Sequence, residues 1–465
     1  MKIKYVIFFL LTFITVTVSG QSGGGRDTEA SRLATIRFGT EVEIAALIQT
    51  LRNESADYLD DELITLIDST RNMRILTGVF AFFGEREKTG LENRAIRAIE
   101  EREDENNETV LSAIDYLGQV RASKAAPALM DILDTEERRF MNNAFRALGR
   151  VSSQDKTFAD QTADFLIDFY ENREVGDNNA RDVIIAIGQT GSTKGVPLLI
   201  DIASNPDERF PLRMAAIEAL SAIGDPEGLP VILDAVSTND PNVRSTAVAA
   251  LGPFSGEEVD KAILDAFRDS FFRTRIAATH ASRDRKLEAA VPYLQFRAER
   301  DDVPNVRDEA IRALGAIGNQ EANDVLEELF TNRRNSDRVR ALSAEMLMKN
   351  NGAKNFINIV KEMDDAQQRN QTALYNGLLK VVGEAVIAGD TKEIEDIARR
   401  FLSMGGLMEK LYALDMVANN NLRSLAVEVQ PLTKDRNQSI ANKAERTLER
   451  IGFVAPASDD TEESS

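Results

Sequence analysis

The chain of 465 residues contains no cysteine and no tryptophan, and its only histidine is His280. Without cysteine it cannot form disulfides, thiolate metal sites, a cysteine nucleophile or a lipid-modified N-terminal cysteine. A single histidine cannot supply a metal site that needs several nitrogen ligands. We therefore predict no catalytic residue, no cofactor and no such metal site.

Basic and aromatic residues are also scarce. Lys and Arg number 56 against 76 Asp and Glu, which gives a net charge of −20. Nucleic acids and anionic membrane surfaces both attract basic proteins, so the sequence predicts neither as a partner. Aromatic residues make up only 6% of the chain. We therefore expect a polar, charge-dependent protein contact rather than a large apolar one.

The first twenty residues differ from the rest. Lys2 and Lys4 precede an apolar run from Tyr5 to Val18, and small residues follow up to Gly20. The run is shorter than the roughly 20 residues that span a bilayer. Residues 1–20 are therefore predicted to be a signal peptide cleaved near Gly20, with an uncleaved anchor as the alternative. The mature protein would be periplasmic or secreted, and no later segment is apolar enough to cross a membrane.

Both ends of the mature chain read as unstructured. Residues 21–31 contain three consecutive glycines among polar neighbours, which predicts a flexible linker. Residues 454–465 carry four acidic side chains among serines and a proline, which predicts a disordered acidic tail. Between them, over 32–453, apolar residues recur at spacings of three and four, the pattern of helices.

A recurring anchor residue, apolar in twelve of thirteen cases, ends a predicted helix at a step of about 33 residues. This period predicts a solenoid of stacked helix pairs without a single closed core. The 39-residue gap between Leu148 and Ile187 holds extra residues, near 152–161 or 170–179, that are read either as a binding loop or as neutral drift. The anchors are Leu51, Phe83, Leu117, Leu148, Ile187, Leu220, Leu251, Ser282, Leu314, Leu347, Val382, Met416 and Leu448.

Glycine and proline stand at fixed distances from the anchors. Glycine commonly follows the anchor directly, as Gly188 does, and often recurs four residues past it, as Gly224 does. We interpret both positions as helix ends that adopt left-handed backbone angles. Ten residues past the anchor, proline predicts the first turn of a second helix. These prolines are Pro127, Pro197, Pro230 and Pro292.

The phrases NVRSTAVAALG (242–252) and NVRDEAIRALGAIG (305–318) resemble HEAT repeats of the type found in phycobilisome-lyase-like proteins. The resemblance covers residues 32–453. It implies an all-α, right-handed α-solenoid of about 12–13 HEAT-like helix pairs, whose second helices line a concave face. It is less specific about function, because such repeats serve scaffolds, adaptors and a few enzymes.

Two of the enzyme classes built on this repeat need residues that the chain lacks, whereas the residues alone do not exclude a phycobilin lyase. HEAT-like hydroxylases bind iron through repeated His-Glu pairs, whereas His280 is followed by Ala281. HEAT-like DNA glycosylases need a basic groove and stacking aromatics, and an exported protein would rarely meet a phycobilin. No strand–turn–helix context supports a Ser-His-Asp site. We therefore predict a non-catalytic scaffold that binds unidentified partner proteins.

Two charged positions recur in successive repeats. We interpret them as structural pairs that fix the angle between repeats, as HEAT repeats generally use Asp and Arg. The alternative is a small-ligand or divalent-cation site on the acidic column, although Ca²⁺ needs about six to eight oxygen ligands and no typical calcium loop is present. Arginine lies seven residues before the anchor at Arg213, Arg244, Arg275, Arg307 and Arg340, and an acid lies fourteen past it at Asp131, Asp201, Asp234, Asp265 and Glu328.

The eighth repeat departs most from the pattern, because its anchor is Ser282. From Arg268 to Arg300 there are eight basic and four acidic residues, a local charge of +4. Arginine binds oxyanions through two parallel hydrogen bonds, so the segment is a candidate docking site for an acidic partner. The alternatives are that the repeat has drifted, that its arginines pair with acids of flanking repeats, or that the acidic tail covers it. We interpret His280 as a helix residue whose ring nitrogens are hydrogen-bonded, rather than as a ligand or base. The candidate docking residues are Arg275, His280, Arg283, Arg285, Lys286 and Arg297.

Overall fold

The computed structural model describes residues 29–173, 177–389, 391–404 and 406–453, and over these ranges the chain is helical, without a strand. The all-α fold is therefore confirmed. The predicted signal peptide and the acidic tail lie outside the described residues. Residues 29–31, assigned to a linker from the sequence, instead begin the first helix, so that boundary was placed too late. The chain divides into two compact units, Met1–Ala147 and Leu148–Ser465.

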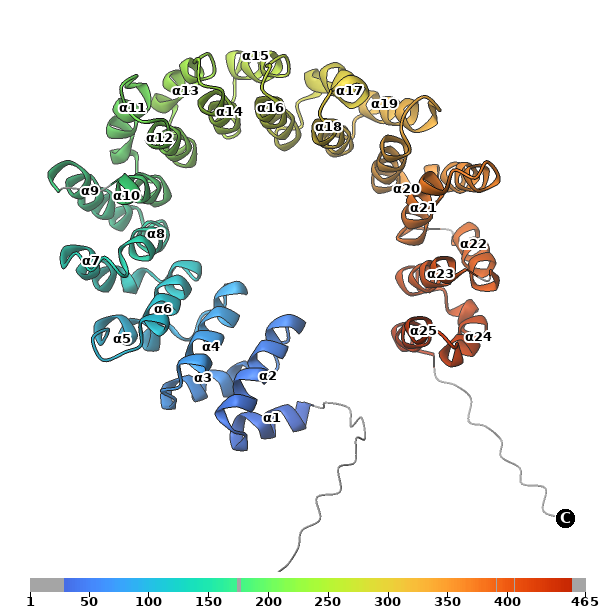
Figure 1. The fold of residues 1–465 in the computed structure, drawn as a ribbon, viewed down its shortest axis with the longest axis horizontal. Helices are drawn as coiled ribbons and strands as arrows, with labels where there is room; N and C mark the ends of the chain where they lie inside the picture. The colour runs from blue at the N-terminus through green and yellow to red at the C-terminus, as the bar shows by residue number, and fades with distance from the viewer. Residues whose placement is uncertain (1–28, 174–176, 390, 405, 454–465) are drawn as a thin grey trace, which may run out of the picture. The chain divides into compact units, whose positions relative to one another are not determined.

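Unit 1 stacks its helices in two layers (Figure 1). In one layer α2 packs on α4 and α4 on α6, and in the other α1 packs on α3 and α5 on α7. The helices are α1 (Glu29–Phe38), α2 (Glu41–Glu54), α3 (Asp60–Ser69), α4 (Met73–Glu85), α5 (Glu92–Glu100), α6 (Asn107–Gln119), the short 3₁₀ turn η1 (Ser123–Ala125) and α7 (Ala126–Asp134). The next helix, α8 (Met141–Ser152), contains the division between the units.

Unit 2 continues with the same element order. Its first half comprises α9 (Lys156–Asn172), α10 (Asp177–Thr190), η2 (Thr193–Gly195), α11 (Val196–Ser204), α12 (Phe210–Ile223), η3 (Pro226–Gly228), α13 (Leu229–Ala235), α14 (Pro241–Ala250), α15 (Glu257–Ala266), α16 (Phe272–Asp284), η4 (Glu288–Ala290) and α17 (Val291–Arg300). The second half comprises α18 (Pro304–Ile317), α19 (Gln320–Thr331), α20 (Asp337–Gln368), α21 (Thr372–Gly383), α22 (Lys392–Ser403), α23 (Leu407–Asn419), η5 (Arg423–Leu425), α24 (Ala426–Val429), η6 (Gln430–Lys434) and α25 (Gln438–Arg450).

In each unit, the anchors lie on the helices that stack directly against one another, among them α2, α4 and α6 in unit 1 and α10, α12, α14, α16 and α18 in unit 2. All are buried except Leu448, which is half-buried in α25, the last described helix. Within each unit, neighbouring anchor helices contact one another, as α4 does α6 and α16 does α18, so the hydrophobic core continues from repeat to repeat. At Asn351 the backbone leaves helical geometry and divides α20 into two helices, which restores the pair pattern there.

The two layers of unit 2 lie on opposite sides of its curve. The anchor helices α10, α12, α14, α16 and α18 lie on the inner side, and α11, α13, α15, α17 and α19 lie on the outer side (Figure 1). The inner helices pack directly against one another along the row. The second helices of the pairs, which the family resemblance placed on the concave face, therefore line the outer face.

The two glycine positions have different roles. Four residues past the anchor, Gly224 and Gly318 adopt left-handed angles with φ of 70° and 65°, as predicted, and end their helices. The glycine directly after the anchor is a different case. Gly188 lies inside α10, and a Cβ atom there would be 2.6 Å from both Cα and Cβ of Ala219 on α12. At Gly188, glycine is thus needed for close helix packing and not for backbone freedom.

The prolines begin the second helices, as predicted. Pro127, Pro197, Pro230 and Pro292 each lie in the first turn of α7, α11, α13 and α17, after a short 3₁₀ turn. Much of the extra length between Leu148 and Ile187 enters a helix rather than a loop. The outer helix α9 has 17 residues, whereas α11 and α7 have nine each.

Candidate partner-binding surfaces of the eighth repeat

The eighth repeat consists of α16, η4 and α17, and small side chains fill its core. Ser282 is fully buried at the anchor position, where the other repeats place an apolar side chain. Its Oγ has no hydrogen-bond partner among the described residues. Ala278 and Ala281 are buried on the same helix. The serine therefore keeps the anchor's place in the core, although it contributes less apolar surface than leucine would.

Arg275 lies in this core and not on the surface. Its Nε and Nη2 atoms each donate to the carboxylate of Asp301 at 2.7 Å, and the side chains are 6% and 0% exposed. Nη2 also reaches Asp302 at 2.8 Å, and Nη1 donates to the carbonyl oxygens of Asp269 and Ser270. All of its donor groups are thus engaged inside the protein. Arg275 cannot receive a partner, which removes it from the predicted docking residues.

Burial alone would raise the pKa of Asp301, but its contacts reverse that effect. The two hydrogen bonds from Arg275 and one from the backbone N–H of Val303 stabilise the carboxylate. The pKa of Asp301 is consequently lowered from its ordinary value. The pKa of Arg275 is raised, chiefly by its hydrogen bonds to Asp301. The pair is therefore ionised at neutral pH and fixes the loop between α17 and α18 against α16.

The other arginines of the column make similar contacts. Arg244 donates to both carboxylate oxygens of Asp269 at 2.8 and 3.0 Å. Arg340, 1% exposed, donates to the carbonyl oxygen of Phe330 and to Glu362. The remaining two bond backbone oxygens: Arg213 that of Ala203, and Arg307 that of Asp301.

The arginine column does not pair with the acidic column. Asp131 pairs with Arg102 at 2.7 Å, and Asp265 pairs with Arg268 at 3.1 Å. Asp201 and Asp234 are exposed on outer helices, without a side-chain partner among the described residues. Of the acids that bind the arginine column instead, Asp269 and Asp301 lie in the loops before inner helices, and Glu362 lies within α20. The sequence showed that acids and arginines recur but not which of them meet.

His280 and Arg283 lie on inner helix α16 and share one acid. Nε2 of His280 is 3.2 Å from the carboxylate of Glu309 on α18, and Nη1 of Arg283 is 3.9 Å from the same oxygen. Arg312 reaches the other oxygen of Glu309 at 3.0 Å. Arg283 also pairs with Asp284 at 2.9 Å. Two cations and the imidazole therefore surround Glu309.

Arg285 and Lys286 follow α16 in a turn. Arg285 is 15% exposed and donates to Asp260 at 2.5 Å and to the carbonyl oxygen of Phe254. Lys286 is exposed, with φ of 49°, and its ammonium has no partner among the described residues. It stands four residues past the anchor, where Gly224 and Gly318 stand in their repeats. Arg285 therefore holds the turn, whereas Lys286 presents a free charge.

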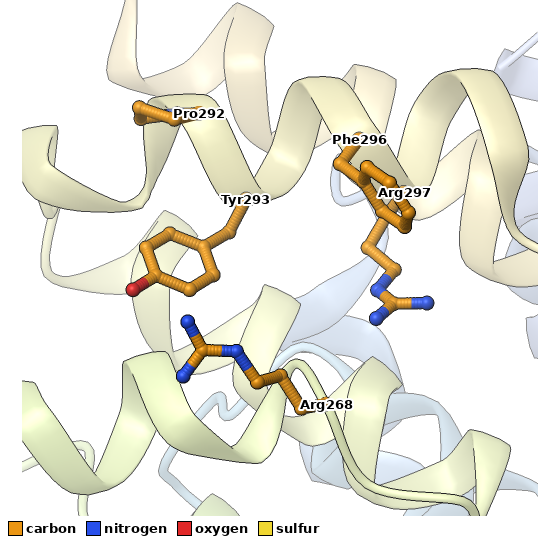
Figure 2. Close-up of a pocket in the computed structure, with 5 residues that line it drawn as sticks. All are labelled: Arg268, Pro292, Tyr293, Phe296 and Arg297. Atoms are coloured by element: carbon orange, nitrogen blue, oxygen red, sulfur yellow. The ribbon is translucent and has the colours of Figure 1, made fainter.

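Arg297 lies apart from these residues, in a pocket of about 370 Å³ between the outer helices α15 and α17. Figure 2 shows its lining: Arg268 follows α15, and Pro292, Tyr293, Phe296 and Arg297 come from α17. The guanidinium carbon of Arg268 is 5.3 Å from the centre of the Tyr293 ring, and that of Arg297 is 5.1 Å from the Phe296 ring. We call these five residues the outer-face pocket.

The sequence profile of the spirochaete HEAT repeat protein family matches residues 36–447. The chain belongs to this family. The HEAT-repeat assignment made from the two quoted phrases is thus confirmed, and no curated protein matches this HEAT protein in sequence.

Solved structures similar to this HEAT protein are distant. Escherichia coli YibA is 17% identical over 56% of this chain and 95% of its own, with a TM-score of 0.37. The CpcE–CpcF complex of phycocyanin lyase from Nostoc is 21% identical over 49% and 87%, with a TM-score of 0.33. The karyopherin Kap121p is 12% identical over 90% and 53%, with a TM-score of 0.44. None of them indicates which partner this chain binds.

The structure thus distributes the six predicted docking residues over four places: the core, the inner face, a turn and the outer-face pocket. Sequence reasoning did not identify Arg268, Tyr293 and Phe296 as the lining of a pocket. A signal for Phe296 was present, because it stands fourteen residues past Ser282, where the flanking repeats place Asp265 and Glu328. An aromatic residue replaces the acid of the column at this repeat.

Two further findings concern the described residues of the HEAT protein. None of their helices combines the length and hydropathy that a membrane span requires. Nor do they contain a cluster of three or more His, Asp or Glu side chains placed to hold a metal ion.

Proposed function

We propose that this HEAT protein is an exported, non-catalytic scaffold that binds partner proteins, and that an acidic partner docks on its eighth repeat. Membership of a repeat family supports the scaffold, because stacked repeats provide long surfaces and no closed catalytic core. The basic start at Lys2 and Lys4, followed by a short apolar run, supports export.

The observation that carries the proposal is the excess of accessible cations at one repeat of an acidic chain. Between Arg268 and Arg300 the charge is +4, while the whole chain carries −20. Arg275 and Arg285 are used inside the protein, but Arg268, Arg300 and Lys286 are exposed. Such a patch favours acidic partners and should lose affinity as salt screens it over about 8–10 Å.

Capture from an envelope extract tests the docking proposal. The chain from Gln21 onward is immobilised and washed at low and high salt, alongside an Arg283→Glu/Lys286→Glu variant. Arg285 stays unchanged, because it holds Asp260 and the Phe254 carbonyl. We expect a salt-sensitive partner that the variant loses. The matched control reverses Arg333 and Arg334, two exposed arginines before α20, and should retain the partner. If the Arg283→Glu/Lys286→Glu variant retains the partner as fully as the control does, docking through Arg283 and Lys286 is excluded.

Export is tested separately. The full chain is produced in a bacterial host with two membranes, and the mature protein is identified by mass spectrometry of each cell fraction. We expect periplasmic protein that begins near Gln21. Cytoplasmic protein that retains its first twenty residues would refute export and leave the scaffold proposal standing.

A further inference from the structure

We propose that the outer-face pocket is a peptide-binding site for an acidic segment of a partner protein, whose aromatic or aliphatic side chain inserts between flanking carboxylates. This inference rests on the proposed scaffold function. The site lies on the outer face, apart from Arg283 and Lys286, and its ligand is an acidic peptide.

The pocket offers apolar surface where the other repeats offer charge. The Phe296 ring is 48% exposed on the outer side of α17. Tyr293 forms the opposite wall in Figure 2 and stacks on buried Phe267, with ring centres 5.7 Å apart. The buried Phe267 ring thus supports one face of Tyr293. An exposed phenylalanine beside a supported tyrosine is a typical anchor for an incoming apolar side chain.

The arginines around the rings keep hydrogen-bond donors available. Arg268 lies over Tyr293, and both Arg297 and Arg300 lie within 5.7 Å of the Phe296 ring centre. A guanidinium group that lies over a ring keeps its N–H groups directed outward in its own plane, where carboxylates bind. The rings thus orient the arginines for an anionic ligand.

The acids already present do not saturate these donors. Among the described residues, Arg297 has one ion pair, at 3.3 Å to Asp301, whose two oxygens already accept from Arg275. Arg300 is 3.9 Å from Glu299, beyond hydrogen-bonding distance, and its side chain is 69% exposed. Arg268 contacts Asp265 at 3.1 Å, but both side chains are more than half exposed. An exposed pair of this kind is weak and exchanges readily for a stronger carboxylate partner.

The size and setting of the pocket favour a peptide over an extended polyanion. About 370 Å³ lies at the small end of the range for ligand sites, enough for one side chain and its neighbours. Asp265 on α15 and Glu328 on α19 carry the acidic column on both sides, and the chain as a whole carries −20. A nucleic acid or membrane surface would extend over both of these acids, whereas a short segment spans only the pocket, where Asp265 beside Arg268 is the one column acid that it meets.

Fluorescence polarisation with a labelled heptapeptide, Gly-Asp-Glu-Phe-Glu-Asp-Gly, tests the site on the chain from Gln21 onward. We expect saturable binding that weakens at high salt. Phe296→Asp, which restores the acid found in flanking repeats, should lower affinity about 10- to 30-fold. Arg297→Gln should lower it about tenfold. The matched control is Phe210→Asp on α12, an exposed phenylalanine at 50% exposure, and should bind like the unchanged chain.

Two peptide controls separate specific from general attraction. Alanine in place of phenylalanine, or lysine in place of the acids, should abolish most binding. No binding by the unchanged chain, equal binding by Phe296→Asp, or equal binding of the alanine peptide would each overturn the site. A circular dichroism spectrum identical to that of the unchanged chain shows that each variant is folded. If the capture experiment still yields a partner that depends on Arg283 and Lys286 but the peptide does not bind, the pocket proposal is refuted and the proposed scaffold function stands.

Discussion

Arg275 and Asp301 form the most buried charge pair of the eighth repeat, and the protein's stability should depend on it. Replacing Arg275 with methionine keeps the apolar stem but leaves the Asp301 carboxylate buried without its main partner. Breaking a buried pair in this way costs about 3–5 kcal/mol. We expect the lower end of that range, because Arg297 retains its 3.3 Å contact. Urea unfolding followed by circular dichroism measures the loss, with Arg268→Gln as an exposed control that should change little.

The same substitution has a distinctive pH dependence. The pKa of Asp301 is lowered in the folded protein, so the pair's contribution is complete above the carboxyl group's unfolded pKa of about 3.9 and is lost as pH falls through the folded value. In the Arg275→Met variant, burial should raise the pKa of Asp301, and protonation at mildly acidic pH relieves the penalty. The stability difference should therefore be largest near neutral pH and shrink on acidification. A difference independent of pH would show that lost packing, not charge, causes the destabilisation.

Two fully buried serines provide a matched test of hydrogen bonding. Ser282 Oγ has no partner among the described residues, whereas Ser152 Oγ lies 2.7 Å from the Leu148 carbonyl oxygen and 2.8 Å from Thr162 Oγ1. An unsatisfied buried hydroxyl costs about 1–3 kcal/mol, and a satisfied one contributes about 1 kcal/mol. Ser282→Ala should therefore raise the unfolding free energy and Ser152→Ala should lower it. Shifts of the urea midpoint in the same direction would contradict this account.

At the scale of helices, the glycine after the anchor sets how closely inner helices approach. A Cβ atom on Gly188 would clash with the backbone of Ala219, whereas one on Gly252, the equivalent position in another repeat, meets nothing closer than 3.6 Å. Gly188→Ala should cost about 1–3 kcal/mol through overpacking. Gly252→Ala should be neutral or slightly stabilising, because alanine restricts the unfolded chain. Urea midpoints of the two variants test this, and equal destabilisation would refute the packing role.

Features that depend on nearby residues were predictable, and those that depend on packing were not. The spacing of Leu220, Leu251 and Leu314 locates buried positions, and Pro292 marks a helix start, because both follow from local geometry. The role of Gly188 depends on Ala219 in the next repeat. The inner position of the anchor helices depends on how whole pairs stack. The sequence of a single repeat therefore predicts neither the packing role of Gly188 nor the inner position of the anchor helices.

The candidate site shows the same division. Counting charges from Arg268 to Arg300 located the unusual repeat, since composition needs no structure. It could not show that Arg275 is buried, or that Arg283 lies on inner helix α16 and Arg297 on outer helix α17, because each helix pair contributes one helix to each layer (Figure 1). The column position of Phe296 points to a binding surface only in combination with its exposure and its place beside Arg268 in the outer-face pocket, and both of these depend on the fold.

For the molecule as a whole, the exposed acidic column raises the question of cation binding. The acidic column places Asp201, Asp234 and Asp265 on three successive outer helices, α11, α13 and α15. Oxygens that share one Ca²⁺ each lie about 2.3–2.6 Å from the ion, and therefore within about 5 Å of one another. Among the described residues, no three His, Asp or Glu side chains are grouped so that they could hold one metal ion, and the column offers one acid on each of these helices.

We therefore expect calcium to leave the thermal unfolding midpoint unchanged. The comparison is made against sodium chloride at equal ionic strength, because screening alone relieves repulsion within a chain of net charge −20. A ligand that binds only the folded state raises the midpoint progressively once its concentration exceeds the dissociation constant. A calcium-specific rise, absent with sodium, would favour the cation-binding alternative. Loss of that rise in an Asp201→Asn/Asp234→Asn variant would then assign it to the acidic column, whereas its persistence would place the ion elsewhere in the chain.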